Sequence, residues 1–500
     1  MNRRVFYRHL AGGGIASMVL HRTAPAFAQG AARPIITSGV QLGDMVNDQL
    51  VVWSRADRPS RMWIEASKTE DFASIRSIPG PNVLPGSDFT GKRLLSLKYF
   101  PEHHFRVRFE NLSQPGALSE PVLFTPPKSN PEQGVRFAWS GDVAGQGYGI
   151  DEARGGMKMF ERMRQQRLDF FVHSGDAIYA DGPMQPEVKL KDGTTWKNQM
   201  TDAKAKVADR LEDFWGNYRY NLLDDHLRAF AAEVPVFGQW DDHEVTNNWY
   251  PGEVLSEDDP HEEKSVSLLA ARARQAFFDY MPVGPGAAAQ QQIYRKISRG
   301  PLLDLFFLDL RSDRGSNPEH GPLMNQQQLS WFKRSLKAST GTWKVICSDL
   351  PIGLVVGDGK EFEAFSNGAA TIGTREQQLA ELLSFMKAHQ IRNVIWLTAD
   401  VHHASSMHYH PDRAVFKDFD PFWEFVSGPI HAGSFGPSKL DMTFGPERLF
   451  NSREGVPYSH APNDQNQFFG LVEIAADSSL TLSHINRGGE VRWKRILEPV

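Results

Sequence analysis

Acidic side chains stand directly after several short apolar runs of this 500-residue sequence. Runs of that length and composition are typical of buried strands. In an open α/β sheet, residues just past the carboxyl ends of the strands converge on one crevice. Five separate runs should therefore bring together the side chains of Asp142, Asp176, Asp242, Asp349, Asp400 and His402.

Carboxylates gathered in this way need compensating cations. Two like charges about 4 Å apart repel by roughly 4 kcal/mol at an effective dielectric near 20. Oxygen ligands suit hard metals, and a metal pair can clamp both the attacking and the leaving oxygen of an in-line phosphoryl displacement. A single Asp after a strand is also a common cap or turn residue. Capping does not explain why Tyr179 and His402 occur in the same loops. Their presence favours a metal site.

The elements that must position these residues begin at residue 135. Near-continuous apolar runs alternate there with amphipathic stretches, which predicts an α/β fold with helices covering the sheet. The predicted strands are 135–140, 168–173, 234–239, 302–310, 343–347, 393–398, 422–426 and 468–474, with further strands over 479–497. The predicted helices are 156–167, 203–232, 263–280, 325–338 and 374–389.

The N-terminal quarter of the chain has a different sequence pattern. Residues 34–127 contain short alternating runs broken by Gly, Pro and Asp, which predicts an all-β sandwich of immunoglobulin or fibronectin type. A Pro-rich polar linker follows it. We therefore expect a β-sandwich domain over 34–127 and a catalytic domain over 134–500.

Residues 1–28 have the features of an export signal. Arg3 and Arg4 open a twin-arginine pattern, an uncharged stretch follows, and Ala26 to Ala28 form a small-residue cleavage site. The uncharged stretch is too short to span a bilayer, and no other run is long and apolar enough to do so. This pattern predicts a bacterial protein exported through the Tat translocon to the periplasm or the medium.

The composition limits which binding partners and which kinds of metal site are possible. The 55 basic residues are outnumbered by 60 acidic ones, so no polybasic surface indicates nucleic acid or anionic lipid as a partner. Cys347 is the single cysteine, which excludes a zinc–thiolate cluster or an iron–sulfur centre. It lies in an apolar run and is expected to be a buried structural residue.

The order of these motifs resembles a known family. Asp142, Gly175-Asp176 with Tyr179, Asp242-His243-Glu244 and Asp400-Val401-His402 are similar to the motifs of the calcineurin-like metallophosphoesterases. More narrowly, the sequence resembles the alkaline phosphatase D family and its purple acid phosphatase relatives, also over residues 51–55, 240–248 and 308–314. The resemblance implies a metallophosphoesterase sandwich of mixed sheets flanked by helices, behind an N-terminal β-domain.

The resemblance also implies two metal ions. One, iron(III) in the purple enzymes, would be held by Asp142, Tyr179 and His402, with Asp176 bridging to the second. The second would be held by Asp176, Asp242 and Asp400, joined by Asp349. Such an all-carboxylate set favours calcium, manganese or magnesium. Relatives often have a cysteine where Asp142 stands, which leaves open whether iron is held here in the same way.

Further roles follow from the same resemblance. His243 would contact the phosphate and act as general acid toward the leaving oxygen, or it would orient Asp242. Arg311 is a candidate for stabilising phosphate charge, with an ion pair to a nearby Asp as the alternative. Gln146 and Asn247 are candidates for substrate binding. The remaining histidines of this region, His403, His408 and His410, are expected to be loop residues.

Together these features predict an exported hydrolase in which a metal-bound hydroxide attacks phosphorus in line. We expect a phosphomonoesterase, with a phosphodiesterase or phospholipase-D-like hydrolase as the alternative. Loops 181–202, 244–262 and 405–421 are expected to roof the site with Trp196, Trp249, Tyr250 and Tyr409. Two other classes stay open, a glycan-binding protein with a vestigial metal cluster and a metal-dependent amide or lactone hydrolase.

Overall fold

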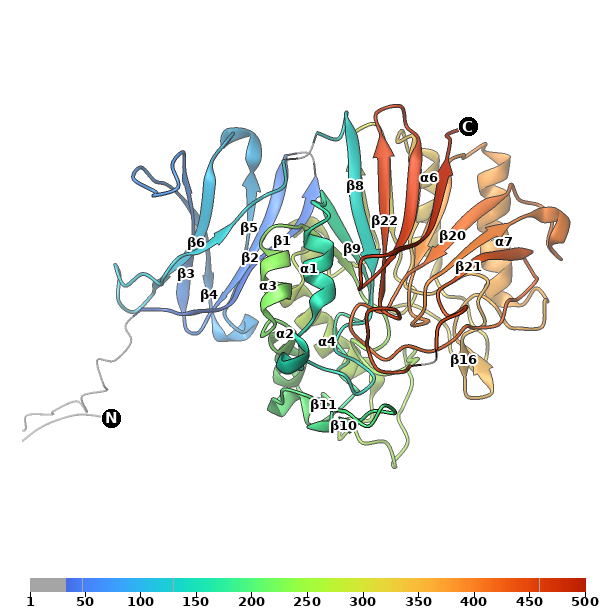
Figure 1. The fold of residues 1–500 in the computed structure, drawn as a ribbon, viewed down its shortest axis with the longest axis horizontal. Helices are drawn as coiled ribbons and strands as arrows, with labels where there is room; N and C mark the ends of the chain where they lie inside the picture. The colour runs from blue at the N-terminus through green and yellow to red at the C-terminus, as the bar shows by residue number, and fades with distance from the viewer. Residues whose placement is uncertain (1–32, 47, 129, 458) are drawn as a thin grey trace, which may run out of the picture.

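The computed structural model describes residues 33–46, 48–128, 130–457 and 459–500 (Figure 1). The predicted export signal at 1–28 lies outside these residues. Among the helices that the structure describes, none combines the length and the apolar character that a membrane crossing needs.

The first part of the chain forms two antiparallel sheets, as predicted. One contains β1 (Ile36–Val46), β2 (Gln49–Ala56) and β5 (Thr90–Ser96). The other has the order β4 (Arg76–Val83), β3 (Ser60–Ser67), β6 (His104–Asn111) and β7 (Val122–Phe124). Buried side chains such as Leu42, Ile64 and Val107 belong to one core that joins both sheets. The all-β character expected of the N-terminal part is confirmed.

Two mixed sheets form the larger part of the molecule. The first has the order β12 (Val236–Gln239), β9 (Phe170–Ser174), β8 (Gly134–Ser140), β22 (Phe468–Ala475), β23 (Leu480–Asn486) and β24 (Val491–Leu497). The second has the order β13 (Arg295–Arg299), β14 (Leu303–Phe307), β15 (Trp343–Cys347), β18 (Val394–Thr398), β20 (Phe422–Val426), β19 (Ser405–Tyr409) and β21 (Pro446–Asn451). Their facing side chains share one apolar core, in which Phe170 stacks on both Phe137 and Phe237.

Helices cover the outer faces of both sheets (Figure 1). The first sheet packs against α1 (Lys158–Arg164) and α3 (Asp225–Ala231). The second packs against α6 (Gln326–Lys337) and α7 (Thr374–Ala388). A further core cluster contains α2 (Leu211–Asn221) and α4 (Val266–Tyr280), and α5 (Pro285–Gln290) follows α4. The predicted α/β architecture of mixed sheets flanked by helices is confirmed.

Several short elements lie in the connections. The 3-10 helices are η1 (Pro85–Ser87), η2 (Leu97–Tyr99), η3 (Glu152–Arg154), η4 (Asp202–Lys204) and η5 (Pro411–Arg413). Two small hairpins are formed by β10 (Glu187–Lys189) with β11 (Thr195–Lys197), and by β16 (Gly357–Asp358) with β17 (Glu361–Phe362). The second hairpin reaches the candidate site described below.

Some predicted boundaries are wrong. The single helix expected over 203–232 is divided into η4, α2 and α3. The carboxylate of Asp213 accepts from the backbone N–H of Arg210 and starts α2, and Asp224 accepts from the N–H of Leu227 and starts α3. The strand expected over 302–310 ends at Phe307, because Asp309 accepts from the N–H groups of Arg311 and Ser312 and turns the chain. Local side-chain hydrogen bonds thus override the apolar pattern.

The N-terminal sheets are fastened to the end of α4. Asp44 makes a buried two-pronged ion pair with Arg295, at 2.9 and 2.8 Å. The backbone N–H of Asp44 donates to the carbonyl of Pro282, and the Trp53 indole donates to the carbonyl of Asp279. These contacts hold β1 and β2 against the helices that lie behind the candidate site.

Candidate metal centre

The carboxyl ends of the strands in the two sheets meet at one crevice. β8, β9 and β12 run parallel to one another, as do β14, β15, β18 and β20. The loops that follow them line a pocket of about 280 Å³. Seven of the predicted site residues line it, namely Gln146, Asp176, Asp242, His243, Asn247, Asp400 and His402.

Three overlapping groups of side chains in this crevice could hold a metal ion. Within each group the candidate ligand atoms lie within 4.8 Å of one another. The groups are Asp142 with Asp176 and His402, Asp176 with Asp242 and His243, and Asp241 with Asp242 and Asp400. Asp176 belongs to the first two groups and Asp242 to the last two. The structure therefore places adjacent cation positions that share carboxylates.

Tyr179 lies at the first of these groups. Its phenol oxygen is 2.8 Å from Nε2 of His402, and its ring stacks on His243 with centroids 4.3 Å apart. The same Nε2 is 3.4 Å from a carboxylate oxygen of Asp142. On the other side of the imidazole, Nδ1 of His402 contacts the carbonyl oxygen of Gly433. Since a carbonyl oxygen only accepts, Nδ1 carries the proton and Nε2 is left free to bind a metal.

The candidate ligands share an unusual backbone conformation. Asp142, Asp176, Asp400 and His402 have φ angles of 68°, 51°, 71° and 52°, in the left-handed region that non-glycine residues rarely adopt. Such conformations persist where surrounding structure over-determines them, and they cluster at functional sites. Before Asp176, Gly175 has φ 100°, and a Cβ there would lie 2.4 Å from the side chain of Asp241. Only glycine fits at that close approach.

Electrostatics at this crevice favour bound cations. Burial and the neighbouring carboxylates raise the pKa of Asp142, Asp176 and Asp400 well above the ordinary value. Oxygens of Asp142, Asp242 and Asp400 are buried without a hydrogen-bond partner among the described residues. Buried polar atoms are normally satisfied, so orphaned anionic oxygens of this kind fit metal ions. The residues present are therefore those that a hard-metal centre needs.

Asp242 differs from its neighbours. Burial would raise its pKa, but His243 and Arg311 outweigh burial and lower that pKa to about 2. One carboxylate oxygen accepts a hydrogen bond of 2.7 Å from the backbone N–H of Asn248. Its other oxygen stays 3.7 Å from the Arg311 guanidinium. Asp242 thus favours the charged carboxylate, in contrast to Asp142, Asp176 and Asp400.

Arg311 lies beneath the crevice, not in its opening. The side chain has no exposed surface, and its guanidinium nitrogens are 2.6 Å from both Asp241 and Glu363. A third nitrogen lies 3.7 Å from Asp242 and 3.9 Å from Asp400. The structure therefore gives Arg311 the ion-pairing position that was the alternative to a phosphate contact.

Asp349 is set back from the other candidate ligands. It is fully buried, 3.7 Å from Arg311, and belongs neither to the lining of the pocket nor to the three groups. Cys347 is buried in β15, as expected for a structural residue. The expectation of loop residues is confirmed for His403 and His410 and is wrong for His408, which lies in β19.

The predicted roof of the site is wrong in part. Trp196, Trp249 and Tyr409 are buried in the protein core and do not line the pocket. Residues 405–409 form strand β19, in which every residue except His408 is buried. The mouth of the pocket is lined instead by Val355, Val356 and Phe435, which come from two other loops.

The sequence analysis gave no role to several charged residues of the site. Asp181 accepts from Nδ1 of His243 at 2.8 and 2.9 Å and also from the backbone N–H of Asn247. Glu244 accepts from the N–H groups of Asp176, Ala177 and Asp241 and so fixes two ligand loops to each other. Asp241 and Asp181 stand beside recognised motif residues, which was an available signal. Glu363 carries no such signal.

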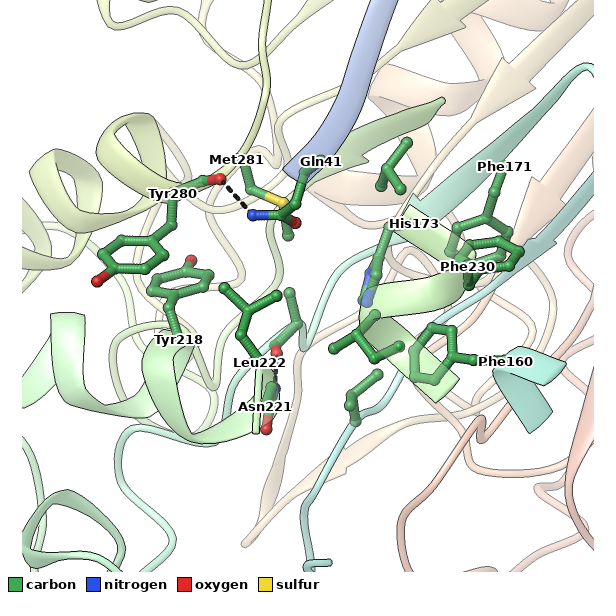
Figure 2. Close-up of a pocket in the computed structure, with 14 residues that line it drawn as sticks. Gln41, Phe160, Phe171, His173, Tyr218, Asn221, Leu222, Phe230, Tyr280 and Met281 are labelled. Atoms are coloured by element: carbon green, nitrogen blue, oxygen red, sulfur yellow. Dashed lines mark hydrogen bonds between the residues drawn. The ribbon is translucent and has the colours of Figure 1, made fainter. Parts of the chain in front are cut away.

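A separate cavity of about 50 Å³ lies behind the Asp176 loop (Figure 2). Figure 2 shows His173 and Phe171 of β9 on one side, and Leu222 and Asn221 at the end of α2 on another. No Asp, Glu or Cys is present among the described residues that line it. The side-chain amide of Asn221 donates to the carbonyl of Ala177 at 2.6 Å. This cavity is part of the packing that supports the loop, and it has no metal-ligand set.

Two mixed sheets whose strand ends gather Asp, His and Tyr around adjacent cation positions define a metallophosphoesterase-type hydrolase. A family model described as PhoD-like phosphatase matches residues 137–484, and one described as its N-terminal domain matches residues 22–121. The chain belongs to the PhoD-like phosphatase family. It is a metal-dependent phosphoric ester hydrolase.

Individual relatives agree with the family. Alkaline phosphatase D of Bacillus subtilis (strain 168) is 26% identical over 453 residues, covering 81% of this chain and 70% of the relative. A solved structure of PhoD superposes with a TM-score of 0.67 at 19% identity, covering 95% of this chain and 94% of that one. The purple acid phosphatase PPD1 of yellow lupin gives a TM-score of 0.58 at 11% identity, covering 91% and 73%. At these identities the two structures support the fold alone.

Proposed function

We propose that this protein is an exported phosphomonoesterase with a two-metal centre built on Asp176. The observation that carries the proposal is the membership of Asp176 in two adjacent groups of potential ligands. A metal pair supplies a nucleophile from bound water at neutral pH and stabilises the charge of the phosphoryl transition state. The chain itself must hold that pair, orient the ester and deliver a proton to the leaving oxygen.

We assign iron(III) to Asp142, Asp176, Tyr179 and His402, and calcium, manganese or magnesium to Asp176, Asp242 and Asp400. A phenol beside a free imidazole nitrogen supports a trivalent, phenolate-binding metal at the first position. Asp242 shares one ligand group with Asp176 and another with Asp400, and carboxylates of this kind support a hard divalent cation at the second. Arg311 and Asp349 stand behind these ligands, where Arg311 offsets part of the negative charge.

His243 is proposed as the general acid. Burial alone would lower its pKa, but Asp181, Asp242 and Asp176 outweigh burial and raise it well above the ordinary value. Asp181 holds Nδ1, so Nε2 is the atom that can donate a proton to the leaving oxygen. The exposed Gln146 and Asn247 at the mouth are proposed to bind the ester through their neutral amide groups.

A phosphodiesterase is the second candidate. The described residues that line the pocket include no Lys or Arg. A phosphate diester carries one negative charge fewer than a monoester, so this lining also suits a diester. The deciding experiment compares kcat/KM on p-nitrophenyl phosphate and on bis(p-nitrophenyl) phosphate after adding back each metal. Higher kcat/KM on the monoester supports the proposal, and the reverse supports the diesterase. Inactivity on both with the metals loaded would refute both candidates.

We also propose an export signal and a division of the chain into two domains. A twin-arginine signal at 1–28 would direct the folded protein to the Tat translocon, followed by a sandwich domain over 34–127 and a catalytic domain over 134–500. Replacing Arg3 and Arg4 together by Lys should leave the protein inside the cell. Export of that variant at the normal level would contradict the twin-arginine assignment.

A further inference from the structure

Phe435 is a large apolar side chain in a pocket whose lining includes several carboxylates. Its side chain is 37% exposed, and it lines the crevice together with the candidate metal ligands. Its ring stacks on the imidazole of His402, with centroids 4.5 Å apart and planes inclined by 16°. A half-exposed aromatic ring that contacts a proposed metal ligand is within reach of a group esterified to a phosphate bound there.

The loop that carries Phe435 is fixed on both sides of the ring. The buried Ser434 donates from its N–H to the carbonyl of His460 at 2.8 Å and from its hydroxyl to the carbonyl of His402 at 3.1 Å. After the ring, Gly436 has φ 92°, and a Cβ there would lie 2.6 Å from the imidazole of His403. A ring held in place before binding loses little entropy when a ligand contacts it.

The rest of the mouth is uncharged. Val355 and Val356 are half-buried beside it, and Gln146 and Asn247 are exposed neutral amides. The carboxylates lie on the floor, where the candidate ligand groups are buried. Among the described lining residues there is no Lys or Arg to pair with a carboxylate, a sulfate or a second phosphate on the organic group, and the imidazole of His243 is already paired with Asp181. The chemistry of the mouth therefore suits an uncharged group with an apolar face.

We propose that Phe435 is a specificity-determining residue that selects phosphate esters whose organic group carries an uncharged aromatic ring. The inference rests on the proposed phosphoric ester hydrolysis at this site and specifies the substrate class. The phosphate lies at the carboxylate floor, and the ring of the ester packs against Phe435 at the mouth. Aromatic contacts of this kind stabilise a complex beyond the area that they bury.

The test compares benzyl phosphate with ethyl phosphate, because both release a primary alcohol and only one carries a ring. In metal-loaded Phe435→Ala, the ratio of kcat/KM for benzyl over ethyl phosphate should fall about tenfold relative to the wild type. Phe435→Trp keeps a ring and should retain most of the ratio, whereas Phe435→Leu should not. Leu112→Ala removes an apolar side chain of similar exposure (39%) directly after β6 and should leave the ratio unchanged.

A binding measurement separates recognition from chemistry. Calorimetry should show benzylphosphonate binding more tightly than methylphosphonate to the metal-loaded wild type, with that difference lost in Phe435→Ala. Equal losses on the two esters, at unchanged metal content, would mean that Phe435 acts only through His402 and would overturn the inference. Inactivity of the wild type on every phosphate ester would instead refute the proposed function, and phosphonate binding would then decide the role of Phe435 alone.

Discussion

The phenol oxygen of Tyr179 lies 2.8 Å from Nε2 of His402, although 223 positions separate the two residues in the chain. Tyr179 comes from the loop after β9 and His402 from the loop after β18, so each of the two sheets contributes one of them. Burial and nearby carboxylates raise the pKa of the Tyr179 phenol well above its ordinary value. A phenol in this environment ionises only when a strongly charged cation stabilises the phenolate, and the proposed iron(III) would do so.

Tyr179→Phe should therefore abolish a visible absorption band. In the iron-loaded wild type we expect a phenolate-to-iron charge-transfer band, and the phenylalanine variant lacks the oxygen that produces it. Absorption spectra of both proteins at matched iron content test this. An unchanged band in the variant would exclude Tyr179 as an iron ligand.

Asp176→Asn should remove metal from both positions at once. The residue belongs to two ligand groups, and an amide cannot supply the negative charge that two cations share. We expect a loss of bound metal measured by elemental analysis and a fall in kcat of at least about 10³-fold. The control is Asp412→Asn, at a carboxylate that is 87% exposed, which should change neither quantity. Full metal content in Asp176→Asn would contradict the shared role.

Asp181→Asn should shift the pH profile of kcat toward acid. Asp181 is one of the groups that raise the pKa of His243, so neutralising it lowers that pKa. A general acid must be protonated, and the basic limb of the profile therefore moves to lower pH, with kcat reduced by about 10–100-fold. Asp192→Asn, at an exposed carboxylate in the β10–β11 turn, is the matched control. A basic limb that stays in place would exclude His243 as the group titrating there.

Arg311→Met should destabilise the fold strongly. The guanidinium compensates Asp241 and Glu363, which are both almost fully buried, and removing one partner of such a network costs about 3–5 kcal/mol. Urea denaturation of the metal-loaded protein measures the free energy of unfolding. Arg33→Met, which breaks an exposed ion pair with Glu120, should change it by less than about 1 kcal/mol. Similar values for the two variants would contradict the buried role of Arg311.

The metal-free protein should lose stability as the pH rises above about 6.5. Burial raises the folded-state pKa of Asp142 and Asp176, and that of Glu244 to about 8, above their unfolded values. Between those values the folded state binds more protons than the unfolded state, so the free energy of unfolding falls with pH. Asp242, whose pKa is lowered to about 2, contributes the opposite slope only at low pH, and buried histidines such as His173, whose pKa burial lowers to about 4, contribute it up to about pH 6.5.

Thermal unfolding measured at intervals from about pH 6.5 to pH 8, where the buried histidines are neutral in both states, checks this prediction. With a chelator the midpoint should decrease steadily, and with metals added it should stay nearly level, because bound cations replace the protons. Parallel curves with and without metal would show that the clustered carboxylates are not the source of the slope.

The sequence by itself determined the strands and the residues that follow them. Apolar runs such as 343–347 and 393–398 are typical of buried strands, and this placed the acids that follow them at the sheet edge. Motif spacing then brought Asp176, Asp242 and His402 into one site, as the structure has them. These are local patterns, each contained within about ten residues.

The tertiary structure alone decided which charged residues lie beneath the site and which side chains line the mouth of the pocket. Arg311 points toward Glu363 and not into the pocket. Phe435 lines the mouth of the pocket, where Trp249 had been expected. Nothing near these residues in the chain indicates their neighbours, because the contacts arise when two sheets, built from distant segments, pack face to face. Long-range packing sets burial, and burial decides whether a charged side chain meets a substrate or only another charge.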